Sequence, residues 1–191
     1  GVPPKAGSFP CIAAPRVIGI LAHEALGHLA EADLTVNSSF NGKLGEVVAA
    51  DGVNMTDDGT IRGNTGTSRF DDEGIPTSRV EIIKDSVLTE LLTNREYAAK
   101  TGMRPTGNAR AESYLYPPII RMRNTFFEPG TFSEEELLEG IKFGYFCADF
   151  RGGQAQMNAS FQVGIQEAYE IVNGEIGRSV TDLSISGIAT D

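Results

Sequence analysis

A glutamate flanked by two histidines is the group of residues in this sequence best suited to chemistry. His23 and His28 are the only histidines among the 191 residues, and Glu24 follows the first of them in the run Leu21-Ala-His-Glu-Ala-Leu-Gly-His28. Neutral imidazole is a good ligand for Zn²⁺, and a neighbouring carboxylate can take a proton from a water that the metal has activated. These are the residue types of a metal-assisted hydrolytic site.

The spacing of the two histidines departs from the usual zinc-protease pattern. In H-E-x-x-H they are four residues apart and share one helix face, whereas here the fifth residue after His23 is the second histidine. Five steps turn it about 140° around a regular helix. A π-bulge would bring both residues back onto nearly the same face, and a looser backbone near Gly27 would be another way. The alternative is that His23 and His28 are ordinary side chains on different faces.

A third metal ligand is not evident from the residues alone. Zinc hydrolases normally use three protein ligands and leave a fourth position for water. Cys147 is one candidate, but Phe146-Cys-Ala is typical of a strand interior, where a thiol is usually packed. Glu31 and Asp33 follow on the same helix, and we expect carboxylates that orient a histidine or are solvated. The acidic turn Asp71-Asp-Glu-Gly74 is weak evidence for a cation site.

One helix must position these residues, and most of the other elements are predicted to be strands. An apolar stripe with little polar relief predicts a buried helix over about residues 16–32. Strand-like sequence lies between residues 47 and 60, and a hairpin is predicted about Asp85-Ser86. Asn94 and Ser133 have the residue types that begin short helices, and Ser133 opens a capping box that predicts a helix to about Ile141.

The last third of the chain is predicted to be an antiparallel meander. Asn173-Gly174 is its strongest hairpin signal. Glycines between many short segments indicate frequent turns. The fold class is therefore α+β: mainly antiparallel β-sheets packed around the buried helix that carries His23 and His28, with two or three further short helices. We expect a single domain over residues 1–191, because no linker or repeat divides the chain.

Composition excludes several classes of partner. The formal net charge of −10 argues against direct binding of nucleic acid, which needs a basic face. No apolar run is long enough to cross a bilayer, and the first residues lack the apolar core of a signal peptide. Two cysteines far apart in the sequence, Cys11 and Cys147, fit a reducing compartment. We therefore expect a cytoplasmic protein that does not interact with membranes.

A larger set of motifs resembles one family along essentially the whole chain. His23-Glu-Ala-Leu-Gly-His28 with Glu31-Ala-Asp33 resembles the HExxxH signature of the TldD/PmbA proteins, the modulator of DNA gyrase family of zinc metallopeptidases. Further motifs match in the family's order: Gly42-Lys-Leu-Gly-Glu46, Asp57-Asp-Gly-Thr60, Asp71-Asp-Glu-Gly74, Pro105-Thr-Gly-Asn108, Arg121-Met, Gly152-Gly-Gln154 and Glu167-Ala-Tyr-Glu-Ile-Val. Because many motifs match in the same order, this resemblance is far more specific than a match to the six residues of HExxxH alone.

The resemblance implies roles for individual residues. His23 and His28 would bind zinc, and Glu24 would activate the water. The family's third ligand is a cysteine in a Gly-x-Cys-Gly segment, which would lie beyond Asp191, and Cys147 does not occupy that position. The chain would correspond to the C-terminal catalytic domain of a TldD-type subunit, with the N-terminal domain and the extreme C-terminal segment absent. The family forms homodimers or heterodimers with PmbA-type subunits and takes its substrate as an extended strand.

Residues of the segment after Pro105 are weaker candidates for contacting a peptide substrate. Asn108 and Ser113 would donate hydrogen bonds to a peptide carbonyl or shape the loop. Arg110 and Arg121 would bind a substrate carboxylate or pair with the acidic turn at Asp71, and we favour the structural pairing.

Two hypotheses for the function follow from these residues. The first is a zinc-dependent peptidase that hydrolyses peptides or unfolded polypeptide segments, with Glu24 as the proton acceptor. The second is a non-catalytic peptide-binding or assembly subunit in which His23 and His28 are structural. Direct binding to DNA, which the family's historical name suggests, fits poorly with the excess of negative charge.

Overall fold

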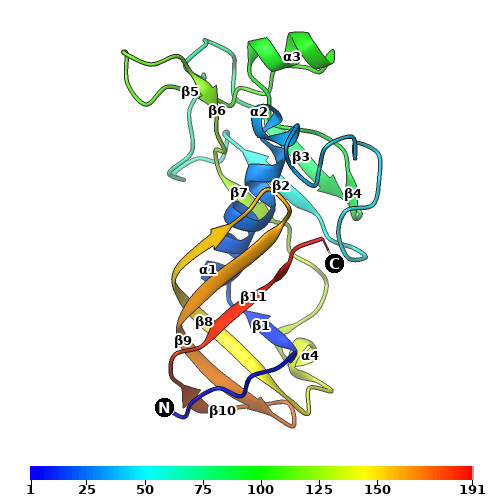
Figure 1. Ribbon diagram of the computed structural model, residues 1–191, viewed down its shortest axis with the longest axis vertical. Coiled ribbons are helices and arrows are strands. Elements are labelled where there is room, and N and C mark those ends of the chain that lie inside the picture. The colour runs from blue at the N-terminus through cyan, green and yellow to red at the C-terminus, as the bar shows by residue number, and fades with distance from the viewer. Residues whose placement is uncertain (191) are drawn as a thin grey trace.

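A computed structural model describes residues 1–190, and within them two sheets are joined by one irregular helical segment (Figure 1). The larger sheet has the order β1-β8-β9-β10, with β11 also paired to β9. Its strands are β1 (Cys11–Ala13), β8 (Phe143–Ala155), β9 (Ser160–Val172), β10 (Glu175–Val180) and β11 (Ser184–Ile188). All of these pairs are antiparallel except β1 with β8, which is parallel.

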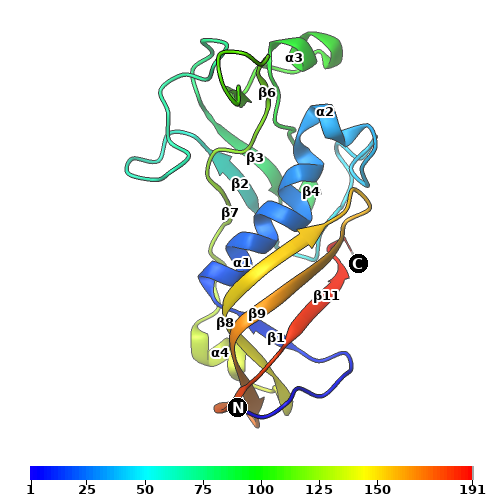
Figure 2. The same cartoon turned by 60° about the vertical axis from the view of Figure 1, so that its left-hand side comes forward.

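The smaller sheet has the order β4-β3-β2-β7, and all its pairs are antiparallel. Its strands are β2 (Met55–Asp58), β3 (Arg79–Lys84), β4 (Val87–Leu88) and β7 (Thr125–Phe127). A separate ribbon pairs β5 (Ala109–Arg110) with β6 (Ile119–Ile120). Figure 2 shows this ribbon and helix α3 (Arg95–Thr101) at the end of the molecule away from the larger sheet.

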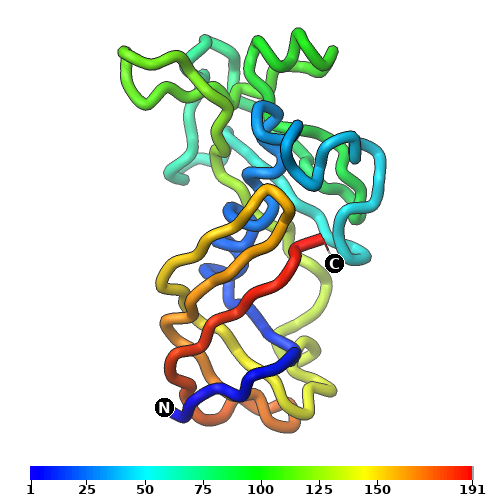
Figure 3. The backbone as a smooth tube through the Cα atoms, viewed as in Figure 1, coloured from blue at the N-terminus to red at the C-terminus, as the bar shows by residue number. Residues whose placement is uncertain are grey.

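The helical segment between the sheets changes its winding along its length. It begins as α1 (Pro15–Leu21), widens into the π-helix η1 (Ala22–Gly27), tightens into the 3₁₀ turn η2 (His28–Ala30), and ends with α2 (Ala32–Thr35). Pro15 suits the first helical position because it lacks an N–H that would otherwise be unpaired there. The tube in Figure 3 shows the N-terminal residues crossing the larger sheet before the chain enters α1.

Two apolar clusters are bridged by this segment. Val17 packs in the cluster formed mainly by the larger sheet, whereas Leu26 and Leu29 pack in the cluster of the smaller sheet. The prediction of a buried helix is only partly right, because the segment is buried along one side. Ile18 is 36% exposed and His23 is also exposed, so a solvent-accessible face carries the first histidine.

Several locally specified elements match the sequence predictions. The β3–β4 hairpin turns at Asp85 and Ser86, both with positive φ, and Asn94 accepts the Tyr97 N–H at the start of α3. Helix α4 (Glu134–Leu138) has the complete capping box of Ser133 and Glu136, although it ends before the predicted Ile141. The prediction of an antiparallel meander in the last third is confirmed by β8, β9 and β10.

Two predictions about strands need correction. Within residues 47–60 only Met55–Asp58 form a strand, because the preceding residues make turns. The parallel pairing of β1 with β8 was not predicted, since it joins segments that are far apart in the sequence. None of the helices formed by the first 190 residues has the length and apolarity that a membrane crossing needs.

Candidate metal centre

The two histidines are joined by the backbone hydrogen bond of a π-helical turn. The His28 N–H donates to the His23 carbonyl oxygen, five residues earlier. A regular α-helix would direct that N–H to residue 24 instead. The wide turn predicted as one way to bring the rings together therefore occurs, and it lies between the two motif histidines.

The imidazole rings converge as a result. Their centroids are 4.8 Å apart, and the ring planes make an angle of 83°. In a regular helix the two side chains would point about 140° apart, so the description of His23 and His28 as unrelated side chains on different faces does not fit. The rings provide two neighbouring nitrogen donors, which is the chemistry that a zinc ion needs in two of its four positions.

Gly27 lets the wide turn pack against its neighbours. A Cβ at this position would lie 2.2 Å from Met122 Sδ and 2.9 Å from the Ala22 carbonyl oxygen, the one that begins the π-helix. Real Cβ atoms do not approach other atoms so closely, so a larger residue would displace Met122 or open the turn.

A matched pair of glycine substitutions tests this packing. Gly27→Ala is expected to lower the free energy of unfolding by about 2 kcal/mol through overpacking. Gly19→Ala, in the same segment, is expected to raise it by about 0.5–1 kcal/mol, because a Cβ there meets no atom of residues 1–190 within 4 Å. Urea denaturation of both variants makes the measurement. Equal effects would show that Gly27 is not constrained by its neighbours.

Glu31 is the carboxylate that holds one of the rings. Its side chain is fully buried, and its Oε2 lies 2.8 Å from His28 Nδ1 and 3.4 Å from Arg121 Nη1. An ionised carboxylate only accepts hydrogen bonds, so Nδ1 of His28 donates and Nε2 is left to bind a metal. This contact is the one expected of a residue that orients a ligand, although its role in metal binding stays a prediction.

The two histidines have shifted pKa values of opposite sign. The hydrogen bond that His28 donates to Glu31 raises the pKa of His28. The exclusion of water from part of the His23 ring lowers its pKa, and the neighbouring His28 ring lowers it further. Both effects favour the neutral form of His23, which is the form that binds metals.

Glu24 differs from Glu31 in both burial and partners. It is only half-buried, so water can solvate its charge without a partner in the chain. Its carboxylate makes no hydrogen bond or ion pair within the described part of the chain. The carboxylate that needs compensation is Glu31, and His28 and Arg121 supply it. Glu24 thus stays free to accept a proton.

The remaining candidates for metal ligands do not join this pair. Among the 190 described residues no three His, Cys, Asp or Glu side chains are grouped so as to hold a metal ion. Cys147 is buried in the interior of β8, as predicted for a packed thiol. The acidic turn is occupied by backbone donors, with Asp71 Oδ2 accepting from Ala109 N and Asp72 Oδ2 from Ala111 N.

Asp33, the other predicted orienting carboxylate, does not contact either ring. Burial raises its pKa, and the neighbouring Glu31 raises it further. One oxygen each of Asp33 and Glu31 is buried with no hydrogen-bond partner in residues 1–190. The two carboxylates lie close enough to interact electrostatically, but only Glu31 reaches His28.

The predicted substrate-binding residues lie in and around the β5–β6 ribbon. Asn108 is buried, and its amide donates to Asp57 Oδ2 and to the Arg121 carbonyl oxygen. Ser113 Oγ accepts from Leu115 N and shapes the loop between the strands. Arg110 is exposed, and no ion pair joins it to another described residue. Their binding of a substrate stays a prediction.

Arg121 was expected to bind a substrate carboxylate or pair with the acidic turn at Asp71, and the structure places it elsewhere. It pairs with Glu31 and donates to the carbonyl oxygen of Ile120. No local pattern predicts this pairing, because Glu31 and Arg121 come from distant segments that meet only in the folded chain.

A pocket next to His23 is the feature that residue patterns did not reveal. It has a volume of about 530 Å³ and is lined by Gly19, His23, Gly63, Asn64, Thr65, Arg123, Asn124, Thr125 and Phe126. Four of these residues lead into or belong to β7, the edge strand of the smaller sheet. Asn124 O accepts from Asp58 N of β2, and Glu128 N donates to Asn54 O, just before β2. By alternation the backbone groups of Thr125 and Phe127 face away from β2.

Comparison with known proteins places this site in a family context. Residues 6–191 match the family described as the PmbA/TldA metallopeptidase C-terminal domain. The zinc metalloprotease TldD homolog of Saccharolobus solfataricus is 43% identical over 188 residues, which are 98% of this chain and 42% of that protein. The metalloprotease TldD homolog of Haemophilus influenzae is 35% identical over 185 residues, 95% of this chain and 38% of that protein.

The fold is shared with a solved structure. TldE from Thermococcus kodakarensis superimposes with a TM-score of 0.84 at 25% identity, covering 98% of this chain and 43% of that one. This chain thus spans about two fifths of the length of the relatives that it matches.

Proposed function

Because this chain belongs to the PmbA/TldD metallopeptidase family, we propose that it is the zinc-binding part of a longer peptidase. The substrates would be peptides or unfolded polypeptide segments. The observation that supports the proposal most directly is the π-helical hydrogen bond from His28 to His23, which brings two imidazole donors together beside a free carboxylate. One relative named zinc metalloprotease supports the choice of metal.

His23 and His28 would hold the zinc ion, and Glu31 would keep His28 in the tautomer that exposes Nε2. A bound zinc ion supplies Lewis acidity toward a carbonyl oxygen and lowers the pKa of a water. The third ligand would come from outside residues 1–190, because the described residues provide none grouped with the two rings.

Glu24 would act as the general base and then as the general acid. Its half-buried carboxylate follows His23 directly and has no competing ion pair in the described residues. A carboxylate in this position would take a proton from the attacking water and pass it to the leaving amine of the peptide. Arg121 is engaged with Glu31 and would not neutralise Glu24.

The substrate would lie along the free edge of β7. An extended peptide can add to an exposed strand edge through its main chain, which requires little sequence preference. Thr125, whose backbone groups face outward, lines the same pocket as His23. We also propose a homodimer or a heterodimer with a PmbA-type subunit, which is supported by the family resemblance alone.

Zinc binding by the longer protein tests the proposal. His23 and His28 are the only histidines of the 191 residues, and the variants His23→Ala and His28→Ala identify their two imidazole signals in the isotopically labelled longer protein. We expect zinc to shift both signals together, and His23→Ala or His28→Ala to weaken zinc binding at least about tenfold. Cys11→Ser is the control, because an exposed thiol can bind zinc by itself.

The result also decides between the two functions. If zinc leaves both imidazole signals unchanged and a chelator does not alter stability, the histidines are structural. The protein would then be the non-catalytic peptide-binding or assembly subunit.

A further inference from the structure

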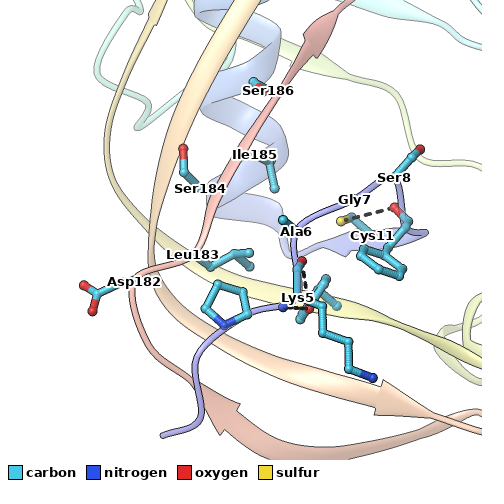
Figure 4. Close-up of a pocket in the computed structure, with 13 residues that line it drawn as sticks. Lys5, Ala6, Gly7, Ser8, Cys11, Asp182, Leu183, Ser184, Ile185 and Ser186 are labelled. Atoms are coloured by element: carbon cyan, nitrogen blue, oxygen red, sulfur yellow. Dashed lines mark hydrogen bonds between the residues drawn. The ribbon is translucent and has the colours of Figure 1, made fainter.

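A pocket on the larger sheet has few charged groups, and they do not converge. It has a volume of about 420 Å³ and is lined by residues 4–9, Cys11, Tyr145 and residues 182–186. Of these lining residues only Lys5 and Asp182 are charged, and both are exposed. Figure 4 shows their side chains pointing away from each other. Charged groups that converge on one buried side chain lie instead beside the two histidines.

Glu31, that buried side chain, is fixed first at its backbone. It interrupts the helical segment with an extended conformation, φ −71° and ψ 113°, between η2 and α2. The residues on either side of it bond to Leu92, whose N–H donates to the Ala30 carbonyl oxygen and whose carbonyl oxygen accepts from the Ala32 N–H. Leu92 is fully buried. This short bridge therefore fixes the point from which the Glu31 carboxylate enters the interior.

Arg121 is fixed from another part of the chain. Its N–H donates to the Asn108 carbonyl oxygen, and its own carbonyl oxygen accepts from the Asn108 side-chain amide. Its Nη1 donates to the Ile120 carbonyl oxygen at 2.9 Å and to Glu31 Oε2 at 3.4 Å. Both the backbone and the guanidinium of Arg121 are thus held while the guanidinium faces Glu31.

These contacts form a chain that ends at His28. Glu31 Oε2 accepts from Arg121 and also from His28 Nδ1, the latter at 2.8 Å, whereas Oε1 is buried and has no partner among residues 1–190. A buried carboxylate is costly unless it is paired. Within the described chain, Arg121 brings the one permanent positive charge that pairs with Glu31. Arg121 therefore supplies much of what keeps this carboxylate in position.

We propose that Arg121 is a positioning residue for the zinc site: it holds the Glu31 carboxylate against His28, and so fixes His28 in the tautomer whose Nε2 is free. This inference rests on the proposed binding of zinc by His23 and His28. Without the guanidinium, Glu31 would keep a single hydrogen bond and would face the like charge of Asp33, so its carboxylate would turn away from the ring. The neutral His28 ring would then exchange between two tautomers, one of which carries a proton on Nε2 and cannot bind a metal there.

The tautomer of His28 in the zinc-free longer protein tests the proposal without any metal. The ¹⁵N shifts of the ring, recorded at about pH 9, where imidazole is neutral, are expected to show the proton on Nδ1 in the native protein. Arg121→Met removes the charge and is expected to give a mixture of both tautomers. Arg121→Lys keeps a positive charge and should preserve most of the native pattern. The matched control is Arg95→Met, on an exposed residue at the start of α3, which should not change it.

Zinc affinity gives the second readout. Arg121→Met is expected to weaken zinc binding about tenfold, and Arg95→Met should leave it unchanged. A folded Arg121→Met variant in which the His28 proton stays on Nδ1 overturns the proposal, and so does a native ring protonated on Nε2.

The remaining outcomes are also decisive. If Arg121→Met does not fold, Arg121→Gln replaces it with the same expectation. If neither variant folds, Arg121 is a structural residue and the proposal fails. A native protein that shows the expected tautomers in all variants but binds no zinc supports the action of Arg121 on His28 and refutes only the proposed zinc binding.

Discussion

Replacing Glu24 by glutamine is expected to slow peptide hydrolysis by the longer protein about 10²- to 10⁴-fold. Glutamine has nearly the same shape but cannot accept a proton from water. Because the Glu24 carboxylate makes no hydrogen bond or ion pair within residues 1–190, the substitution should leave the fold intact. It should also leave zinc content unchanged, since neither imidazole is altered. Turnover of an unfolded polypeptide substrate, measured beside the zinc content, makes the comparison.

Glu175→Gln is the matched control for Glu24→Gln. Glu175 is exposed on β10 of the larger sheet, and its replacement makes the same change of charge away from the two histidines. The control should hydrolyse peptides at the native rate. A Glu24→Gln variant that is equally active, with its zinc in place, would show that another group accepts the proton.

Asp57→Ala is expected to lower the free energy of unfolding by about 3–4 kcal/mol. Asp57 is fully buried, and three donors from distant segments converge on it. Its Oδ1 accepts from Arg123 N at 2.8 Å and Thr125 Oγ1 at 2.6 Å, and its Oδ2 accepts from Asn108 Nδ2 at 2.8 Å. Removing the carboxylate leaves these donors without their acceptor and loosens β7 next to His23.

The control for this substitution is Asp51→Ala. Asp51 is exposed in a turn, and its side chain makes no hydrogen bond to another residue of the described chain. Its replacement should change stability by no more than about 0.5 kcal/mol. Urea denaturation compares the two variants, and equal midpoints would mean that the buried carboxylate does not hold these segments together.

The pH dependence of stability provides a second check on Asp57. Burial raises its pKa above the ordinary value of 3.8, so the folded chain holds this proton more tightly than the unfolded chain does. The contribution of Asp57 to stability therefore falls as pH rises from 3.8 through the raised value. Relative to Asp57→Asn, the native protein should lose stability over that interval, and parallel curves would contradict the shift.

Local signals explain why much of the fold could be predicted. The cap at Asn94, the capping box at Ser133 and the turn at Asn173-Gly174 depend on residues close in sequence, and each forms as expected. Pairing between distant segments carries no such signal. Strand β1 has only three residues, and nothing in them indicates a parallel partner near residue 145.

In the candidate site too, local features could be predicted from the sequence, whereas contacts between distant segments could not. The spacing of His23 and His28 pointed to a wide turn as one of two ways for the rings to meet, and the structure has the wide turn. The burial of Glu31 was not predictable, since a wide turn shifts the phase of every residue after it by about 100°. Periodicity read for a regular helix therefore misplaces the carboxylates that follow the turn. Arg121 reaches Glu31 only through the packing of the folded chain.

The wide turn couples the binding of a ligand by both imidazoles to the choice between π-helix and regular α-helix. A ligand that needs both imidazoles binds only when the π-helical turn is formed. It therefore stabilises this turn by a free energy that grows with the logarithm of the ligand concentration divided by Kd. The relation is reciprocal: a substitution that favours the regular helix weakens such a ligand by the same factor. This helical segment packs into both apolar clusters. A ligand bound by His23 and His28 would therefore also stabilise the packing that connects the two sheets.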